Sequence, residues 1–231
     1  MLIQIRVFLL LGITSAFVIW MMYYWLTQNV HSISVTTRGI FHTSNDSSSE
    51  KYRLNANMSD MKVPNIVHYV WFSFHGETKN FTFLQYVSVL SSLKMIRPTK
   101  IMFHTDKPPS GYYWNLTVEL PSFHIVYRKP TKILFGQKIE TSLYETQASD
   151  LERLKILTEM GGIYLDIDIL VIQSFDKFRK FDLTLGLESD HSICNAIIIS
   201  TSTAPGLIPW LRSFAYDFRT HRRTYNAIEV I

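Results

Sequence analysis

Two aspartates, Asp166 and Asp168, stand two positions apart in an apolar run where Leu165, Ile167 and Ile169 surround them. In an extended segment such side chains project to the same side, about 7 Å apart. Carboxylates in apolar surroundings are costly unless a cation neutralises them, and all-oxygen ligation suits Mg²⁺ or Mn²⁺. We therefore expect a divalent cation here, with a substrate diphosphate completing its ligands. Two aspartates at the solvated end of an ordinary strand would give the same pattern.

The residues upstream contain a second charged pair, Asp150 and Arg153. On a helix over Asp150–Met160, at about 100° per residue, both project onto or beside the apolar face centred on Leu154 and Leu157. Inward charges are costly when unpaired, so the two either pair across their i, i+3 spacing or line a polar cavity. Three other charged residues are expected on the solvated side of the helix: Glu152, Lys155 and Glu159.

This helix has recognisable start and stop signals. Ser149 followed three residues later by Glu152 is a capping-box pattern, and Gly161–Gly162 is typical of a left-handed helix end. A strand is expected directly afterwards, over Ile163–Asp166. The charged pair and the two aspartates therefore belong to one helix–turn–strand unit.

The remaining sequence after residue 62 alternates between strand and helix patterns. Strands are expected over Asn65–Phe72, Lys100–His104, His124–Tyr127, Ile169–Ile172, Leu183–Leu187 and Ala196–Ser200. Helices are expected over Phe83–Met95 and Pro205–Phe218. This alternation predicts a layered α/β domain with a largely parallel sheet.

An uncharged run, Val7–Leu26, precedes all of these elements. A helix over this run is long enough to cross a bilayer hydrocarbon core of roughly 30 Å, and Trp and Tyr residues crowd its C-terminal end, where the headgroups would lie. A cleaved signal peptide usually has an apolar region of about 7–15 residues that ends in small side chains. The run therefore predicts an uncleaved transmembrane signal anchor.

The flanking residues suggest an orientation for this anchor. Arg6 precedes the span, which favours a cytosolic tail over residues 1–6. Residues 27–62 are rich in Ser, Thr and Asn and predict a flexible lumenal stem, followed by a lumenal head over residues 63–231. Four Asn-x-Ser/Thr sequons, expected as glycosylation sites in the secretory lumen, follow the span: Asn45, Asn57, Asn80 and Asn115. The pattern is that of a single-pass type II membrane protein.

Composition excludes several classes of partner and cofactor site. The chain has 231 residues, enough for one domain with an appendage, and its net charge of +4 comes from scattered basic residues. Because nucleic-acid binding needs a concentrated basic stripe, we expect no nucleic-acid partner. Cys194 is the only cysteine, so the chain has no intrachain disulfide and no cysteine-based metal cage.

The segment ASDLERLKILTEMGGIYLDIDILVI (Ala148–Ile172) closely resembles the DXD-containing sugar-binding region of a glycosyltransferase family. That family includes α-1,4-galactosyl- and α-1,4-N-acetylglucosaminyltransferases, yeast initiating α-1,6-mannosyltransferases and, more distantly, large clostridial toxin glucosyltransferases. VPNIVHYVWF (Val63–Phe72) resembles its first strand, and SICNAIIIS (Ser192–Ser200) resembles a later strand beside the donor sugar. The resemblance covers roughly Val63 to Tyr225, nearly the whole expected head.

The resemblance implies a GT-A-type fold, Rossmann-like with a mostly parallel sheet, and assigns roles to individual residues. Asp168 would ligate the metal directly, and Asp166 would contact the donor ribose or sugar and help to hold the metal. Asp150 and Arg153 would reach the ribose and sugar of the donor. Trp71 would stack on or border the nucleotide base.

Two further residues receive less specific roles from the same resemblance. Asn195 would touch the transferred sugar, and His68 would be either a site residue or, as is more usual for a histidine in an apolar strand, a structural one. The implied activity is transfer of a sugar with retention of configuration, assisted by Mn²⁺ or Mg²⁺ as a Lewis acid. A UDP-sugar is favoured over GDP-mannose as donor, the acceptor would be a glycan, glycolipid or glycoprotein, and the location would be the Golgi membrane.

Three alternatives stay open from the sequence. A haloacid-dehalogenase-type phosphatase also places Asp-x-Asp after an apolar strand, but it would not explain Asp150 and Arg153, and its companion Ser/Thr and Lys motifs are not found. A non-catalytic or truncated nucleotide-sugar-binding paralogue is the stronger rival, because the sequence stops at Ile231 whereas the family's domain usually continues. A purely structural membrane protein would have no need of inward carboxylates.

Overall fold

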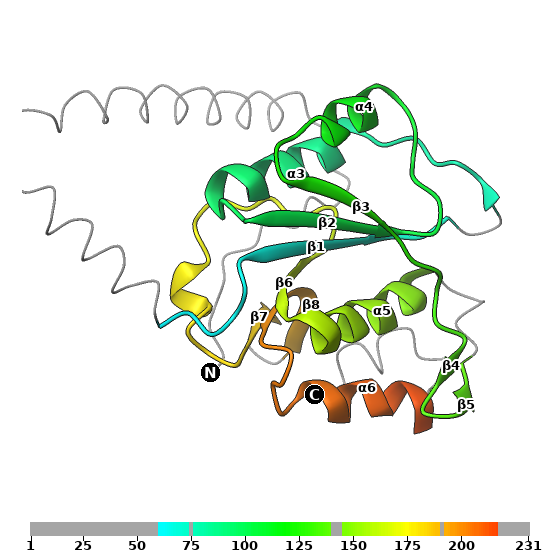
Figure 1. Ribbon diagram of the computed structural model, residues 1–231, viewed down its shortest axis with the longest axis vertical. Helices are drawn as coiled ribbons and strands as arrows, with labels where there is room; N and C mark the ends of the chain where they lie inside the picture. The colour runs from blue at the N-terminus through cyan, green and yellow to red at the C-terminus, as the bar shows by residue number, and fades with distance from the viewer. Residues whose placement is uncertain (1–59, 74–75, 140–144, 190–191, 217–231) are drawn as a thin grey trace, which may run out of the picture. The chain divides into compact units, whose positions relative to one another are not determined.

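A six-stranded sheet forms the centre of the protein in its computed structural model, which describes residues 60–73, 76–139, 145–189 and 192–216 (Figure 1). Its strands are β1 (Ile66–Trp71), β2 (Lys100–Thr105), β3 (Phe123–Tyr127), β6 (Gly162–Leu165), β7 (Leu183–Ser189) and β8 (Ser192–Ser200). The strand order is β3-β2-β1-β6-β8-β7. The pairs β3–β2, β2–β1 and β1–β6 are parallel, whereas β8 is antiparallel to both of its neighbours. The largely parallel α/β sheet expected from the sequence is thus confirmed.

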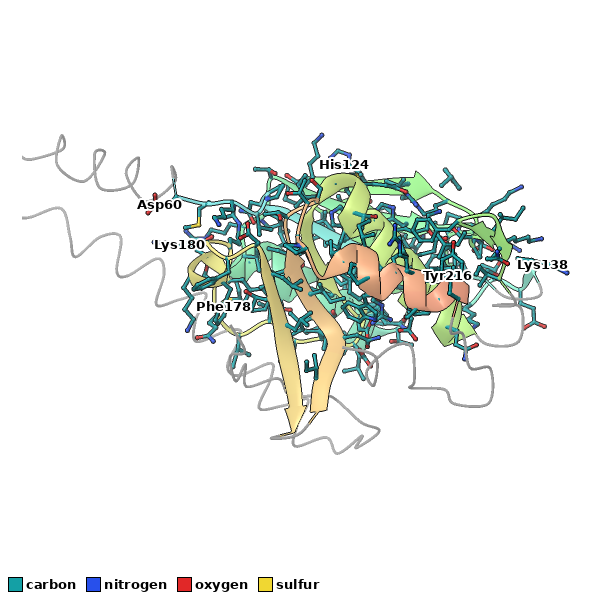
Figure 2. The ribbon with its side chains drawn as sticks, turned by 90° about the horizontal axis from the view of Figure 1, so that it is seen from below. Asp60, His124, Lys138, Phe178, Lys180 and Tyr216 are labelled. Atoms are coloured by element: carbon teal, nitrogen blue, oxygen red, sulfur yellow. The ribbon has the colours of Figure 1, made fainter. Side chains whose placement is uncertain are left out.

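Helices cover both faces of this sheet (Figure 1). One face carries α3 (Phe83–Met95) and α4 (Tyr112–Val118), and the other carries α5 (Glu145–Met160) and α6 (Leu207–Tyr216). Three short elements complete the described chain: the pair β4 (Ile133–Leu134) and β5 (Gln137–Lys138), and the 3₁₀ helix η3 (Asp176–Phe178). Seen from below, Tyr216 at the end of α6 lies beside the β4–β5 pair that carries Lys138, and its ring stacks on Phe135 (Figure 2).

The strands separate two hydrophobic cores because successive side chains of a strand point to opposite faces. In β6, Ile163 and Leu165 join the core under α3, whereas Tyr164 between them joins the core under α5 and α6. Strand β8 repeats the pattern, with Ile198 on the α5 side and its two isoleucine neighbours on the other. A continuous apolar strand sequence therefore indicates burial on both faces.

Most elements lie where the sequence predicts them. Helix α3 has the predicted bounds, and β1, β2, β3, β7, β8 and α6 differ from expectation by a few residues within the described chain. Helix α4 and the β4–β5 pair were not predicted. The strand expected over Ile169–Ile172 is wrong, because the segment follows a turn in which the Ile169 N–H donates to the Asp166 carbonyl at 3.1 Å.

Two expectations about helix α5 are also wrong. The helix begins at Glu145, so Ser149 lies in its interior and does not cap it; its carbonyl instead accepts a hydrogen bond from Arg153 Nε at 3.3 Å. Glu152, expected in solvent, is completely buried. Its carboxylate accepts hydrogen bonds from the Thr131 backbone N–H at 2.7 Å and from Arg128 Nη1 at 3.2 Å. Partners from the segment after β3 therefore compensate the burial of this charge.

Several predictions concern segments that the structure does not describe. The cytosolic tail, the span Val7–Leu26, nearly all of the stem, Asn45 and Asn57 lie outside the described residues. Among the residues that are described, no helix is both long enough and apolar enough to cross a membrane. Asn80 and Asn115 are described, and both are exposed at the surface. The end of the predicted head, residues 217–231, is not described.

Candidate functional site

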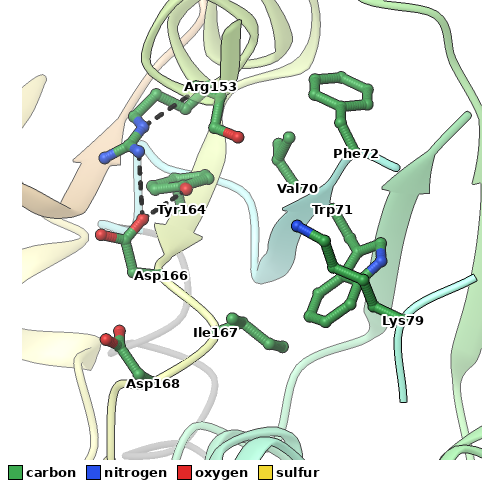
Figure 3. Close-up of a pocket in the computed structure, with 10 residues that line it drawn as sticks. Val70, Trp71, Phe72, Lys79, Arg153, Tyr164, Asp166, Ile167 and Asp168 are labelled. Atoms are coloured by element: carbon green, nitrogen blue, oxygen red, sulfur yellow. Dashed lines mark hydrogen bonds and ion pairs between the residues drawn. The ribbon is translucent and has the colours of Figure 1, made fainter. Parts of the chain in front are cut away.

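The two aspartates of the DID sequence leave the sheet at the carboxyl end of β6. The Asp166 N–H still pairs with the Ala196 carbonyl of β8 at 2.9 Å, but the chain then turns instead of continuing as a strand. The expectation that Asp166 and Asp168 are brought together by extended geometry is therefore wrong. A tight turn achieves the same result, and both carboxylates face one side of the site (Figure 3).

A glycine pair connects helix α5 to strand β6 and lets the chain pass close to strand β1. The Gly161 N–H closes the helix on the Leu157 carbonyl at 2.8 Å, and Gly161 and Gly162 have φ angles of 64° and 120°. A Cβ atom at Gly162 would lie 2.7 Å from Nε2 of His68 and 2.8 Å from the Ile66 carbonyl oxygen. The left-handed helix end predicted from the sequence is confirmed, and it permits a close approach that only glycine allows.

Arg153 is the centre of the charged network between α5 and β6. Its Nη2 atom lies 2.8 Å from Asp150 Oδ1 and 3.2 Å from Asp166 Oδ1, and Nη1 donates to the Asn195 carbonyl at 2.8 Å. The guanidinium lies 4.5 Å from the centre of the Tyr164 ring. The expected pairing of Arg153 with Asp150 is confirmed, and of the two residues Arg153 also lines the cavity described below.

The two aspartates have different electrostatic surroundings. Asp166 accepts a 2.6 Å hydrogen bond from the Tyr164 hydroxyl in addition to its ion pair with Arg153. For Asp168, partial burial and then the nearby Asp166 carboxylate raise the pKa above its usual value. Burial lowers the pKa of Arg153, but the Asp166 and Asp150 carboxylates outweigh it and raise the pKa well above its normal range. Arg153 is therefore permanently charged, whereas for Asp168 burial and the Asp166 carboxylate outweigh the opposing effects of a backbone hydrogen bond and of Arg153.

These groups open onto one cavity of about 250 Å³ at the carboxyl ends of β1 and β6 (Figure 3). It is lined by Val70, Trp71, Phe72, Lys79, Ser149, Arg153, Tyr164, Asp166, Ile167 and Asp168. Trp71 is half-buried and packs on Phe81 and Phe103, with ring centres 5.7 and 6.3 Å away. Its indole N–H is buried and has no hydrogen-bond partner among the described residues. The cavity thus has an aromatic wall and a carboxylate wall.

The carboxylate wall suits a divalent cation that keeps some ligands from outside the protein. No group of three or more His, Cys, Asp or Glu side chains in the described part of the chain could enclose a metal ion. Mg²⁺ and Mn²⁺ are commonly held by one or two carboxylates together with water and substrate phosphates. Asp166 and Asp168 fit that arrangement, because both carboxylates line the cavity and a bound cation would offset the burial and the mutual repulsion that raise the pKa of Asp168.

Asn195 and His68 lie behind the cavity rather than on its wall. The Asn195 side-chain amide donates to Asp150 Oδ1 at 2.9 Å, so it supports the charged network; its contact with a sugar stays a prediction. His68 is fully buried, with Nε2 3.0 Å from the Gly161 carbonyl and Nδ1 3.1 Å from Nε2 of His104. This placement favours the structural alternative for His68.

Several lining residues were not predicted as site residues, among them Tyr164 and Lys79. Tyr164 stands two positions before Asp166, so strand periodicity could have placed both on one side. Lys79 comes from the loop after β1, and no pattern in the sequence connects it with the aspartates. Only the parallel pairing of β1 with β6 brings that loop to the site.

Comparison with known proteins gives three results. A family model described as the glycosyltransferase sugar-binding region containing a DXD motif matches residues 47–184. Glucan organizing enzyme 1 of Cryptococcus neoformans var. grubii is 30% identical over 168 residues, which are 67% of this chain and 44% of that protein. An uncharacterized Arabidopsis thaliana protein is 32% identical over 83 residues, covering 34% of this chain and 12% of its own length. The chain thus spans less than half the length of either relative.

A solved structure also matches the fold. The PaToxG glycosyltransferase has a TM-score of 0.52 and 20% sequence identity over 78% of this chain and 72% of its own. At that identity the likeness concerns the fold alone. The α/β architecture with its mostly parallel sheet, which the sequence predicts, is thus similar to that of the PaToxG glycosyltransferase, and the GT-A type of the fold stays a prediction.

Proposed function

The chain belongs to the family of glycosyltransferases with a DXD-containing sugar-binding region, and from this premise we propose that it transfers a sugar from a nucleotide-sugar donor. A UDP-sugar is the favoured donor, ahead of GDP-mannose, and a hexose or N-acetylhexosamine is the transferred group. The acceptor is a glycan, glycolipid or glycoprotein. The name of the Cryptococcus relative refers to glucan, which is compatible with the first of these.

One observation supports this proposal most directly: the aspartates of the motif share a cavity with an aromatic wall and with Arg153, which is paired to the buried Asp150. Trp71 offers a flat apolar surface for the nucleotide base, and Asp166 and Asp168 lie at the polar side, where a charged diphosphate would need a cation. Arg153 pairs with Asp166 and lines the cavity, and Asp150 pairs with Arg153, so we assign both to the ribose or sugar end of the donor. An aromatic surface beside a few convergent polar groups is typical of ligand sites.

We assign two kinds of role to the residues of the site, binding of a cation and orientation of its ligands. Asp168 and Asp166 would hold Mn²⁺ or Mg²⁺, and the bound ion would supply Lewis-acid chemistry toward the diphosphate. Arg153 and the Tyr164 hydroxyl both contact Oδ1 of Asp166, so the carboxylate is held in one orientation before any ligand binds. Such pre-organisation lowers the cost of reaching the transition state. Retention of configuration requires no pair of carboxylates of the glycosidase kind.

The proposed location is the Golgi membrane, as a single-pass type II protein with its head in the lumen. Two observations support it: the uncharged run Val7–Leu26 near the N-terminus, and the exposure of the sequon residues Asn80 and Asn115 on the described head. Sensitivity of the expressed protein to a glycosidase that removes N-linked glycans would test the orientation. Substituting Gln at Asn80 and Asn115 should then reduce the size shift.

The family assignment and the lengths of the relatives bear on two of the alternatives that the sequence leaves open. Family membership argues against a haloacid-dehalogenase-type phosphatase. A nucleotide-sugar-binding protein without transferase activity is the second candidate, because the chain spans less than half the length of the relatives that it matches. It differs from the enzyme in one measurable property, turnover of the donor.

Donor hydrolysis by the full chain tests the proposal. The purified protein is incubated with a panel of UDP- and GDP-sugars, with Mn²⁺ or with EDTA, and release of the nucleoside diphosphate is followed. We expect Mn²⁺-dependent release from one UDP-sugar and its loss in Asp168→Asn. Binding of UDP without turnover of any donor would identify the non-catalytic alternative, and turnover unaffected by EDTA or by Asp168→Asn would overturn the site.

A further inference from the structure

We propose that Lys79 is a donor-binding residue whose ammonium group contacts the diphosphate of the nucleotide sugar. This inference rests on the proposed function, and it assigns a role to a residue outside the DXD-containing segment. Lys79 lines the same cavity as Asp166 and Asp168 although it is 87 residues before the first of them. In Figure 3 it lies on the Trp71 side of the cavity, with its ammonium group turned toward the side on which the carboxylates lie.

The backbone around Lys79 is fixed at this place. Its carbonyl accepts a hydrogen bond from the Ser110 N–H at 3.0 Å, and the Phe81 N–H donates to the Ser110 carbonyl at 2.8 Å. Phe81 is completely buried in the core under α3. Gly76 lies earlier in the same loop, and its carbonyl accepts a hydrogen bond from Nζ of Lys107, which follows β2, at 2.6 Å. The loop therefore presents the half-buried Lys79 side chain from an anchored backbone, which reduces the ordering cost of a contact with ligand.

Two cationic side chains line the cavity among the described residues, Lys79 and Arg153. Arg153 belongs to the network of Asp150 and Asp166, both of which form ion pairs with it. Lys79 lies outside that network and comes from the Trp71 side, so it adds a positive charge at a second point of the cavity, where it can oppose the negative charge of a bound diphosphate.

Lys79 should stabilise the departing diphosphate more than it stabilises the intact bound donor. When the bond between the sugar carbon and the diphosphate oxygen breaks, its electron pair stays on that oxygen, and the negative charge of the diphosphate increases. A fixed ammonium group nearby stabilises that increase, because contacts that strengthen in the transition state raise kcat. Lys79 would therefore influence kcat as well as the affinity for the product diphosphate.

Nucleotide binding by the full chain provides the test, with UDP, GDP, uridine and guanosine as probes in the presence of Mn²⁺. Titration calorimetry or ligand-observed NMR would measure the affinity of each. For Lys79→Gln we expect the affinity for the diphosphate that binds to fall about 10- to 100-fold, the range for hydrogen bonds to charged groups, with the matching nucleoside unchanged. Lys79→Arg should restore most of the loss.

Lys100→Gln is the matched control, since Lys100 is exposed at the amino end of β2, the edge of the sheet opposite the cavity. It removes the same charge and should leave all four affinities unchanged. Equal diphosphate affinity in Lys79→Gln and the wild type would overturn the role of Lys79 while leaving the proposed function intact. Equal loss of nucleoside and diphosphate affinity would also overturn it. Failure of the wild type to bind either diphosphate would instead overturn the proposed function, and the role of Lys79 with it.

Discussion

The Nη2 atom of Arg153 lies 3.2 Å from Oδ1 of Asp166, so a buried guanidinium on helix α5 fixes the first carboxylate of the DID sequence at the end of β6. The same nitrogen contacts Asp150, and Arg153 also reaches the backbone of β8 through the Asn195 carbonyl. One side chain thus connects a helix and two strands at the edge of the cavity. Under the proposed function, the same side chain would affect both stability and donor turnover.

Replacing Arg153 should separate these two effects. In Arg153→Met, Asp150 is left buried without its partner, so we expect the free energy of unfolding to fall by about 3–5 kcal/mol. Arg153→Lys keeps a charge but cannot contact two carboxylates and a carbonyl together, so donor turnover should fall at least about tenfold with a smaller loss of stability. Urea unfolding and donor hydrolysis would measure both. Arg212→Lys, on the exposed face of α6, is the control, and wild-type turnover in Arg153→Lys would contradict the positioning role.

Asp168→Asn should stabilise the metal-free protein at neutral pH. The raised pKa of Asp168 means that the folded protein holds this proton more tightly than the unfolded chain. The wild type therefore loses stability as the pH rises above the ordinary aspartate pKa of about 3.9, until the carboxyl is fully ionised. We expect a gain below about 1 kcal/mol for the variant, because the group is partly solvated.

Melting temperatures in EDTA and in Mn²⁺ would check this prediction. The gain should be present at pH 7 in EDTA and disappear at acidic pH, where Asp168 is protonated in both states. With Mn²⁺ present the order should reverse, since the wild type alone gains stability from the bound cation. A variant less stable than the wild type in EDTA would show that Asp168 is a structural residue rather than a cation ligand.

The buried pair of His68 and His104 should make the protein acid-sensitive. Burial lowers the pKa of His68 to about 4 and that of His104 to about 3, from an ordinary value of 6.5. Because the unfolded chain binds these protons first, stability should fall as the pH decreases from about 6.5 toward 4. In His68→Gln the slope of unfolding free energy against pH should correspond to the uptake of about one proton fewer on unfolding.

Urea unfolding at several pH values would measure that slope. His124→Gln is a suitable control, because His124 is exposed on β3 and its replacement should leave the slope unchanged within error. The amide of the variant could still donate to the Gly161 carbonyl, which limits the loss of packing around the glycine pair. An unchanged slope in His68→Gln would contradict the burial of a neutral imidazole.

Glu152 and Glu159 offer a comparison of a buried with an exposed carboxylate on one helix. Both contact Arg128, but Glu152 is fully buried and also receives the Thr131 N–H, whereas 44% of the Glu159 side chain is exposed. We expect Glu152→Ala to cost about 3–5 kcal/mol of unfolding free energy and Glu159→Ala less than about 1 kcal/mol. Chemical denaturation would measure both. Equal costs would show that Glu152 does not anchor the segment after β3.

Local patterns in the sequence determined much of the fold and of the site. Runs of β-branched and aromatic residues predicted β1, β2 and β8, because strands buried on both faces need apolar side chains at every position. Helical periodicity predicted that Asp150 and Arg153 point inward, and both are buried. The glycine pair predicted the end of α5 at Met160, as observed. These features depend on neighbours within a few positions, which a sequence displays directly.

Only the tertiary structure decided which distant groups meet. Glu152 lies on the polar side of its helix by periodicity, yet it is buried because Arg128 and Thr131 come from another part of the chain to compensate its charge. Lys79 and Trp71 join the aspartates because β1 pairs in parallel with β6, which places the ends of both strands at one edge. The aspartates themselves converge through a turn whose closing hydrogen bond no local pattern indicated. The DID sequence thus contains the two carboxylates of the candidate site, and long-range pairing of strands and charges forms the cavity around them.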